Sequence, residues 1–239
     1  MGVGSRGRRL AVTAAVVPLT VLGASSVTSA TLSRTERSGM RPPMRAIVEY
    51  DGTAFAGSQR YPLHWGGDSS ARWDNLFANV AGGLSLGLCG FPFWSMDIGG
   101  FFGEPDDDLL IRWLQAGLFL SHSRIHGFGD RELYDRGATT DVARDLLHLR
   151  YRLLPYLLGQ ADRAAAAGVP LARALVVDHP EDPTTWHLSD EWLLGDDLLV
   201  APIATPDGAR RAYLPEGDWV HWFTGELHHG PTWLSVQSP

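Results

Sequence analysis

From residue 45 onward, short apolar runs alternate with segments in which apolar residues recur every three or four positions. We expect strands at residues 46–50 and 84–94, because these runs are short and apolar, and at residues 121–126, which are few enough for a strand. The segment after each run has the spacing of a helix with one buried face. The expected buried stripes are Trp73, Leu76, Phe77 and Val80, then Leu110, Trp113, Leu114 and Leu118, then Leu146, Leu149, Leu153 and Leu157.

Acidic residues and a glycine mark the helix boundaries. Asp106, Asp107 and Asp108 open the second helix, where negative charge favours the positive end of the helix dipole. Asp141 is expected to cap the third helix and Gly168 to end it. Beyond this point the pattern changes to short β runs separated by Pro, Gly and Asp, at residues 171–177, 198–202, 212–214 and 219–223. An all-β module is expected there.

The alternation of strand and helix predicts an α/β fold, namely the C-terminal part of a (β/α)8 TIM barrel followed by the start of an all-β sandwich domain. We expect the partial barrel at residues 45–168 and the incomplete sandwich at residues 169–239. About three of the eight strand-helix units of a closed barrel are present. Such a fragment leaves strand edges exposed, which favours aggregation and weakens its stability.

The first 30 residues have the order of a secretory signal. Arg6, Arg8 and Arg9 precede an apolar stretch at residues 10–24, and small residues lead to a candidate cleavage point after Ala30. The stretch is too short and too interrupted by proline for a stable membrane span. The alternative is a spurious leader, with residues 31–44 as a linker. The protein is secreted if the signal is genuine and cytoplasmic otherwise.

Composition excludes some classes of function. The formal net charge is −7, which argues against a nucleic-acid partner. The single Cys89 cannot form an internal disulfide, and its apolar surroundings predict a buried thiol. We expect no metal and no cofactor. The chain has 9 Trp, which suits sugar stacking but suits a core at least as well.

Three polar clusters follow the expected strands, at residues 64–68, 94–100 and 124–127. In a barrel the carboxyl ends of all strands open on one face, so these clusters should converge on one site. Asp68, beside Trp65 and two glycines, has a setting that suits a general acid. The neighbouring polar side chains suit the binding of sugar hydroxyls, with Asp97 as a bidentate acceptor and Arg124 and His126 as donors.

Each of these residues also has a structural interpretation. A Gly-Gly-Asp sequence is a common turn, Asp97 suits a loop cap, and Arg124 suits a stabilising ion pair. His122 and His126 are four residues apart, a spacing that would place both on one face of a helix and suggest a metal pair. This segment has the pattern of strand and loop, which argues against such a pair.

A set of motifs decides between these interpretations. They are FAGSQRYP at residues 55–62, HWGGD at 64–68, GGLSLG at 82–87, FWSMDIGGF at 93–101 and SHSRIHG at 121–127. In order and spacing they resemble glycoside hydrolase family 31, the α-glucosidases and α-xylosidases, with most likeness to the bacterial α-xylosidase-like branch. The resemblance continues more loosely to residue 219 and covers about two-thirds of the chain.

The resemblance implies a role for each candidate residue. Asp68 corresponds to the general acid/base of a retaining glycosidase. Trp65, Asp97 and His126 correspond to residues of the sugar subsite at which the bond is cut, with Trp94 as a further substrate-binding candidate. Arg124 corresponds to a residue that orients the neighbouring carboxylates.

The chain departs from the family pattern before Asp68. Nothing matches the family's nucleophile, an aspartate on an earlier barrel strand, since only Glu36, Glu49 and Asp51 precede Asp68 among acidic residues. Gly52 stands where the family has an active-site arginine. Met96 and Leu133 replace residues common in this branch, which affects the expected substrate contacts.

The expected function is therefore retaining hydrolysis of α-glucosides or α-xylosides, with an α-linked oligosaccharide or glycoside as partner and the truncated chain inactive alone. A one-carboxylate site cannot form a glycosyl intermediate. Two alternatives remain open: a non-catalytic sugar-binding protein, and a separate chain that supplies the first barrel half. In a second form of the enzyme hypothesis, Asp51 or Glu49 acts as a substitute nucleophile.

Overall fold

The computed structural model describes residues 9–13, 49–51, 58, 61 and 63–237. The expected linker at residues 31–44 lies outside the described residues. So does most of the motif at residues 55–62.

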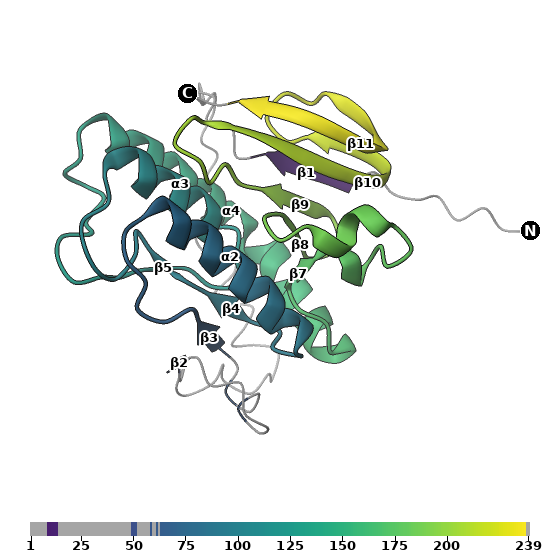
Figure 1. The fold of residues 1–239 in the computed structure, drawn as a ribbon, viewed down its shortest axis with the longest axis horizontal. Helices are drawn as coiled ribbons and strands as arrows, with labels where there is room; N and C mark the ends of the chain where they lie inside the picture. Colours follow the sequence, from purple (N-terminus) through teal and green to yellow (C-terminus); the bar gives the residue numbers. More distant parts are fainter. Residues whose placement is uncertain (1–8, 14–48, 52–57, 59–60, 62, 238–239) are drawn as a thin grey trace, which may run out of the picture.

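The first part of the fold consists of short parallel strands, and helices follow three of them (Figure 1). Strands β2 (Glu49–Asp51), β3 (Leu63–Trp65) and β4 (Trp94–Ser95) form one parallel sheet, and β5 (Asp97–Ile98) pairs in parallel with β6 (Arg124–Ile125). Helices α2 (Trp73–Leu88), α3 (Asp107–Gly117) and α4 (Ala138–Ala167) follow β3, β5 and β6. This is the expected alternation of a partial barrel.

Helix α2 extends through much of the segment expected to be a strand at residues 84–94. Its buried residues are Leu76, Val80, Leu84 and Gly87, spaced by three or four positions, so the helical period continues to Leu88. Only Trp94–Ser95 forms a strand there. Phe77, expected in the buried stripe, is 43% exposed. The prediction failed because an apolar run with glycines fits either element over a few residues.

The glycine pair in α2 provides a test of this packing. A Cβ on Gly83 would lie 2.0 Å from the Trp94 ring, whereas a Cβ on Gly82 would meet nothing within 4 Å. We expect Gly83→Ala to lower the free energy of unfolding by about 1–3 kcal/mol through overpacking. Gly82→Ala should raise it by up to about 1 kcal/mol, because alanine favours the helix. Chemical denaturation of both variants measures the difference, and equal effects would contradict the packing of Trp94 on α2.

Helix α3 has the expected start and the expected buried stripe. Asp106 is its N-cap, and its carboxylate accepts a 2.7 Å hydrogen bond from the backbone nitrogen of Leu109. The expected stripe is confirmed, since all its members are buried: Leu110, Trp113, Leu114 and Leu118. The helix is thus fixed against the strands that carry the polar clusters.

Helix α4 begins earlier than expected. Gly137 is its N-cap position, and Asp141 lies in the first turn rather than before it. Of the expected stripe, Leu153 and Leu157 are buried, and Leu146 and Leu149 are partly buried against the same core. The helix ends at Gly168 in the left-handed conformation, with φ of 70°, as expected. Among the described helices, none has the length and hydropathy needed to cross a bilayer.

The C-terminal part is a six-stranded sheet with the order β11-β10-β1-β9-β8-β7. Its strands are β1 (Arg9–Thr13), β7 (Ala172–Ala174), β8 (Trp192–Leu194), β9 (Leu198–Ala201), β10 (Ala209–His221) and β11 (Leu227–Gln237). Two short 3-10 helices, η2 (Leu175–Val177) and η3 (Pro183–His187), lie between β7 and β8. The runs expected at residues 212–214 and 219–223 are one long strand, β10, with an irregularity between Leu214 and Gly217. Strands β8 and β11 were not expected.

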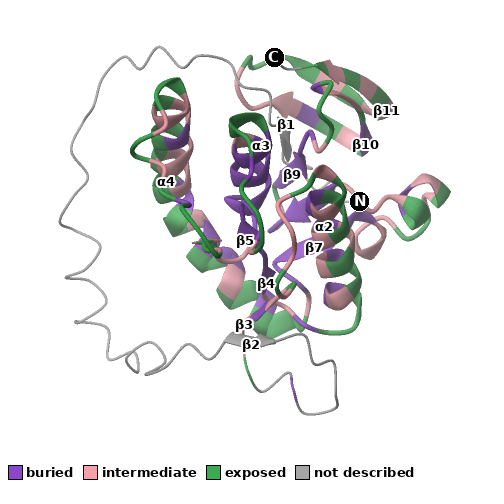
Figure 2. Ribbon diagram, turned by 60° about the vertical axis from the view of Figure 1, so that its left-hand side comes forward, coloured by how far each residue is buried: buried purple, intermediate pink, exposed green. Residues whose placement is uncertain are grey.

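A continuous core joins the two parts of the fold. Figure 2 shows buried residues concentrated on α3 and on the neighbouring strands. The Trp94 indole nitrogen donates to the Ala172 carbonyl at 3.1 Å, and that of Trp192 donates to the Phe119 carbonyl at 2.9 Å. Trp113 and Trp219 are also fully buried, so these four tryptophans are core residues. Cys89 follows α2 and is exposed, contrary to the expected buried thiol.

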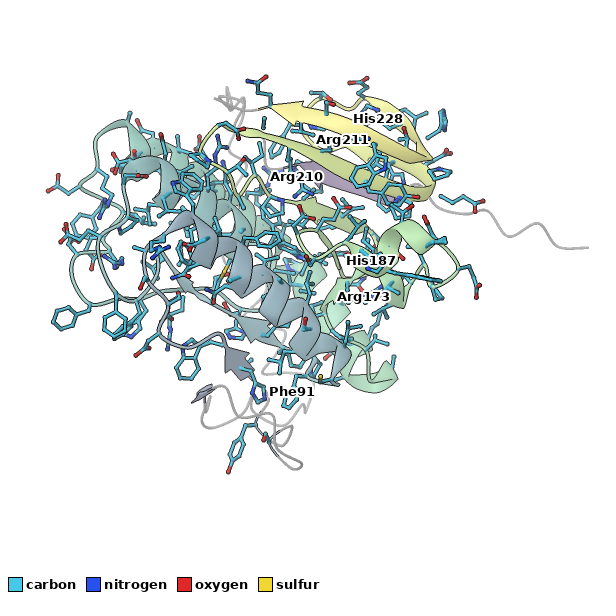
Figure 3. The ribbon with its side chains drawn as sticks, viewed as in Figure 1. Phe91, Arg173, His187, Arg210, Arg211 and His228 are labelled. Carbon is cyan, nitrogen blue, oxygen red and sulfur yellow. The ribbon has the colours of Figure 1, made fainter. Side chains whose placement is uncertain are left out.

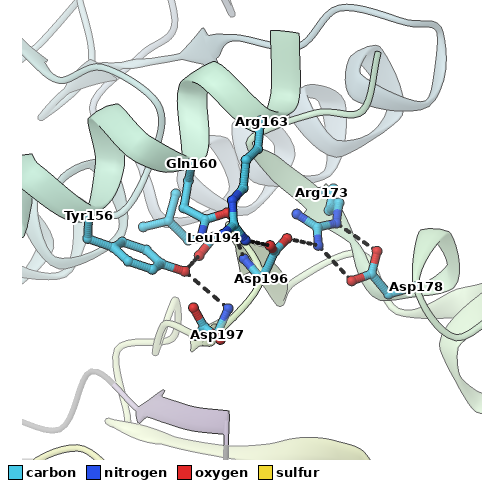
Figure 4. Close-up of polar contacts among 8 residues, drawn as sticks. All are labelled: Tyr156, Gln160, Arg163, Arg173, Asp178, Leu194, Asp196 and Asp197. Carbon is cyan, nitrogen blue, oxygen red and sulfur yellow. Dashed lines mark hydrogen bonds and ion pairs between the residues drawn. The ribbon is translucent and has the colours of Figure 1, made fainter. Parts of the chain in front are cut away.

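Polar contacts also connect α4 to the turn between β8 and β9 (Figure 4). The Tyr156 hydroxyl donates to the Leu194 carbonyl at 2.9 Å and accepts from the Asp197 backbone nitrogen at 3.1 Å. The Gln160 side-chain oxygen accepts from the Asp196 backbone nitrogen at 3.2 Å. These contacts satisfy buried polar groups on both elements, so they fix α4 against the sheet.

Within the sheet, β10 carries Arg210, labelled in Figure 3, into a buried ion pair. Its guanidinium donates to the Glu191 carboxylate at 2.8 Å, and Glu191 is fully buried. Phe91, at the opposite end of the molecule in the same view, packs its edge on His64 with ring centroids 4.5 Å apart. His64 precedes Trp65 in β3, so this contact supports the strand that leads into the first polar cluster.

Candidate active site

The loops that follow β3, β5 and β6 lie against one another. The Phe101 nitrogen donates to the Ser69 carbonyl at 2.7 Å, and the Ala71 nitrogen donates to the Phe102 carbonyl at 2.7 Å. The Phe128 nitrogen in turn donates to the Phe101 carbonyl at 2.6 Å. The structure therefore brings the three polar clusters to one end of the strands.

Glycine permits the close approach of the first two loops. Gly100 has φ of 75°, and a Cβ there would lie 2.7 Å from the Ala71 nitrogen. Gly67, just before Asp68, has φ of 76°. Both positions require a residue that tolerates positive φ, and Gly100 also requires one without a side chain. The glycines beside Asp68 and Asp97 thus set the backbone course of the site.

Asp97 is the most buried charged group of the site. Its side chain is fully buried, and its Oδ1 accepts hydrogen bonds from Arg124 Nε at 2.9 Å and Nη2 at 2.6 Å. Its Oδ2 is also buried and has no hydrogen-bond partner among the described residues. Burial raises the pKa of Asp97, the charges of Arg124 and His126 oppose this rise, and the charge of Asp68 adds to it. One oxygen of the Asp97 carboxylate is therefore hydrogen-bonded to Arg124, and the other has no donor among the described residues.

Arg124 joins Asp97 to Trp65. The centre of its guanidinium lies 5.1 Å from the centroid of the Trp65 ring, within cation–π distance. The Trp65 indole nitrogen is buried and has no hydrogen-bond partner among the described residues. The side chains of Trp65, Asp97 and Arg124 thus form one group drawn from β3, β5 and β6.

Asp68 and His126 lie on the exposed side of this group. Both side chains belong to exposed residues, and the His126 ring lies 5.4 Å from the Phe101 ring. Asp68 follows Gly67 in the loop after β3, and its charge acts on Asp97. An exposed carboxyl beside a buried carboxylate has access to a ligand and to solvent, which a general acid needs.

Trp94 does not join this group, contrary to the sequence-based expectation of a substrate contact. Along the segment from Trp94, alternate side chains take opposite faces: Trp94, Met96 and Ile98 belong to the hydrophobic core, whereas Ser95 and Asp97 lie on the other face. Trp94 is 1% exposed and packs on Gly83 of α2. It is a core residue, and Met96 shares that side of the strand.

Arg131 is a residue of the site that sequence reasoning missed. It is 5% exposed, and its guanidinium donates to the carbonyls of Gly100 at 3.1 Å, Phe101 at 3.3 Å and Gly103. A Cβ on Gly127 would lie 2.6 Å from Arg131 Nε, so the glycine makes room for the side chain. Arg131 thereby holds the loop after β5 against the loop after β6. Its partners are backbone carbonyls, which leave no signal in the sequence.

A hollow of about 400 Å³ lies beside the same loop, between β6 and the start of α4. It is lined by Ile125, Arg131, Glu132, Leu133, Tyr134, Thr140, Ala143, Arg144 and Leu147. Because Ile125 and Arg124 are neighbours in β6, their side chains point to opposite faces of the strand. The hollow is therefore separate from the group around Asp97, and Leu133, a departure from the family pattern, belongs to the hollow.

His122 lies just before β6 and His126 directly after it, so the two residues flank a strand and do not lie on a helix. In the described part of the chain, no three His, Cys, Asp or Glu side chains come together as a metal site would require. The His122 ring contacts the Ser121 hydroxyl at 2.9 Å. Burial, together with the charges of Arg150 and Arg124, lowers the pKa of His122 to about 4. His122 is thus a neutral side chain at neutral pH.

Comparison with known proteins places both parts of the chain. Residues 27–160 match the glycosyl hydrolases family 31 TIM-barrel domain, and residues 168–239 match the glycosyl hydrolase family 31 C-terminal domain. An alpha-xylosidase of Emericella nidulans is 40% identical over 190 residues, which cover 75% of this chain and 24% of that protein. Alpha-glucosidase 2 of Bacillus thermoamyloliquefaciens is 38% identical over 181 residues, 74% of this chain and 23% of that protein.

A solved structure gives the same answer for the fold. The cycloalternan-degrading enzyme from Trueperella pyogenes superposes with a TM-score of 0.73 at 31% identity and covers 77% of this chain and 28% of its own. The chain therefore spans about a quarter of the length of the relatives it matches. The expected architecture, part of a barrel followed by a β domain, is confirmed. Since the barrel model alone matches more than half of the residues, the chain belongs to glycoside hydrolase family 31.

Proposed function

We propose that this chain carries the acid/base and sugar-binding side of a retaining α-glycosidase that acts on α-glucosides or α-xylosides. The relatives named above as an alpha-xylosidase and an alpha-glucosidase support this substrate class. The observation that carries the proposal is the buried Oδ2 of Asp97, which has no hydrogen-bond partner among the described residues, although Oδ1 accepts two hydrogen bonds from Arg124. A buried carboxylate oxygen without a donor is costly, and a sugar hydroxyl supplies one.

Each residue of the group then has a chemical role. Asp97 accepts a hydrogen bond from a sugar hydroxyl, Arg124 holds that carboxylate in place, and the face or nitrogen of Trp65 contacts the ring. His126, exposed beside Phe101, donates to the same sugar. Asp68 protonates the leaving oxygen and then removes a proton from the attacking water.

Retention requires a second carboxyl group about 5 Å from the acid/base to attack the anomeric carbon. Asp51 is an acidic residue at the end of β2, where it is in register with Trp65 at the end of β3. We propose that this residue does not replace the nucleophile, and that the chain alone is inactive. A separate chain carrying the first barrel half is the partner that would complete the site.

Calorimetric titration of the full chain with xylose, glucose and isoprimeverose tests the sugar site. We expect heat of binding for one of these sugars at millimolar concentration, and at least a tenfold weaker affinity for Asp97→Asn, since about 1.5–3 kcal/mol of a charge-assisted hydrogen bond is lost. Asp178→Asn, which alters the Arg173 pair in the β domain, is the matched control and should bind as the parent does. If none of the three sugars gave heat of binding, the proposed sugar site would be wrong.

Hydrolysis of nitrophenyl α-glucoside and α-xyloside tests the catalytic assignment. The chain alone should show no turnover above that of Asp68→Asn. If turnover is found and is lost in Asp51→Ala or Glu49→Ala, one of these residues is a substitute nucleophile and the inactive-fragment proposal is wrong. Co-purification with a second chain, accompanied by turnover that depends on Asp68, would identify the missing half.

A non-catalytic sugar-binding protein is the second candidate. The observation in its favour is that two buried atoms of the group without a hydrogen-bond partner among the described residues, Asp97 Oδ2 and Trp65 Nε1, suit binding rather than proton transfer. This candidate predicts sugar binding that is unchanged in Asp68→Asn, and no turnover in the presence of any partner. Turnover that requires Asp68 would exclude it.

A further inference from the structure

Strand β1 occupies the centre of the C-terminal sheet, although it lies some 185 residues before its neighbours in the chain. In the described sheet, β9 and β10 each pair in parallel with β1, which lies between them (Figure 1). Leu10 is in register with Leu198 on one side and with Val220 on the other. Strand β1 is therefore the element that joins the β7-β8-β9 part of the sheet to the β10-β11 hairpin.

We propose that the space between β9 and β10 is a strand-acceptor site, and that residues 9–13 of the same chain fill it as a complementing strand. All four residues of β9 are buried, and so is Trp219 of β10. Without a strand between them, two rows of backbone N–H and C=O groups would be unpaired in the middle of the sheet.

The sequence of the segment fits such a site. A strand with parallel neighbours on both sides is normally covered on both faces and is rich in apolar residues. Residues 10–12 are Leu, Ala and Val, and neither proline nor glycine interrupts residues 9–13. The acceptor site thus selects an extended, apolar segment of about five residues in parallel register, which is recognition by β-strand addition.

Pairing of residues 9–13 in the sheet is incompatible with removal of the same residues as a secretory signal. Residues 9–13 belong to the run that has the pattern of a secretory signal, and cleavage after Ala30 would remove β1. One molecule cannot both lose this segment and use it in the sheet. We infer that the folded chain retains residues 9–13, and that a chain without them has an acceptor site open to another strand.

Hydrogen exchange of the full chain, followed by mass spectrometry, tests the proposal directly. We expect protected amides at residues 10–13, 198–201 and 219–221. Ala11→Pro removes one ladder hydrogen bond, because each N–H of a central strand faces one neighbour or the other. It should speed exchange at residues 198–201 and 219–221 by about tenfold or more, while residues 109–117 of α3 keep their protection. Ala11→Ser keeps the N–H and should exchange as the parent does.

Addition of a strand in trans separates a specific acceptor site from general loss of stability. A peptide with the sequence of residues 6–15, RGRRLAVTAA, should restore protection at residues 198–201 in the Ala11→Pro chain. The same peptide with proline in place of its central alanine should not. If residues 10–13 of the parent chain exchange as unstructured peptide, the proposal is wrong whether or not the variant folds. A purified chain that starts at Thr31 and still protects residues 198–201 would also overturn it.

Discussion

Replacing Arg131 by methionine should lower the free energy of unfolding by about 1.5–3 kcal/mol. The side chain is 5% exposed and donates to the carbonyls of Gly100, Phe101 and Gly103, which belong to the loop after β5. Methionine has a similar volume but no donor, so these carbonyls lose their charged partner. The Phe101 carbonyl keeps its hydrogen bond from the Phe128 nitrogen, and Gly103 is exposed to solvent. The main loss is the buried hydrogen bond to the Gly100 carbonyl, and a hydrogen bond from a charged donor contributes about 1.5–3 kcal/mol. Urea denaturation followed by tryptophan fluorescence measures the change.

Two variants distinguish this effect from a general loss of charge. Arg144→Met removes an arginine from the same hollow, but its side chain is 54% exposed and pairs with an exposed Asp141, so it should cost less than about 0.5 kcal/mol. Arg131→Lys keeps the charge but lacks the planar fork, so it should restore only part of the stability. If Arg131→Met unfolds as Arg144→Met does, the loops do not depend on this arginine.

The convergence of the polar clusters could be foreseen from the sequence because it depends on topology alone. Each cluster follows a strand, and strands followed by helices are parallel, so their carboxyl ends share one side. The position of Asp97 beside Arg124 follows from this rule, since β5 and β6 pair with these two residues in register. The buried stripe of α3 could be foreseen for a similar reason, because a short helix with one apolar face has one way to pack.

Other features depend on contacts that the sequence does not display. The end of α2 was misjudged because the apolar, glycine-containing run at residues 84–94 has the pattern of a buried strand, whereas its first residues continue the helix, on which Trp94 packs at Gly83. Trp94 was a substrate-binding candidate as part of the cluster at residues 94–100, yet residues three positions apart along a strand face opposite sides. Strand β1 could not be foreseen, because its partners β9 and β10 lie far away in sequence.

Rigidity of the proposed sugar site depends on the C-terminal part of the fold as well as on the loops. The strand segment that presents Asp97 on one face presents Trp94 on the other, and the indole of Trp94 donates to Ala172 of β7. The sheet therefore holds the back of the strand whose front binds Arg124. Loss of sheet structure should consequently loosen the Asp97 group although no residue of the sheet touches it in the described contacts.

The second large effect is expected for the Asp97–Arg124 pair. Arg124→Met leaves a fully buried carboxylate without its partner, and breaking a buried pair in this way costs about 3–5 kcal/mol. Arg124 itself is 31% exposed, which favours the lower end of that range. At neutral pH we therefore expect a loss of about 3 kcal/mol in the free energy of unfolding, measured by chemical denaturation at fixed pH.

The pH dependence of that loss identifies its cause. Burial already raises the pKa of Asp97 above the ordinary 3.8, and removal of Arg124 raises it further. A group with a raised pKa in the folded state binds more protons folded than unfolded, so its contribution to stability is present below 3.8 and is lost as the pH rises through the folded value. The deficit of Arg124→Met relative to the parent should thus shrink as the pH falls towards 3.8. In an Asp97→Asn background the titrating group is absent from both chains, so the deficit of Asp97→Asn/Arg124→Met relative to Asp97→Asn should be independent of pH over this range. A deficit in Arg124→Met that does not change with pH would show that Arg124 stabilises the fold through packing on Trp65 and not through the buried carboxylate, and the electrostatic account of the site would then be wrong.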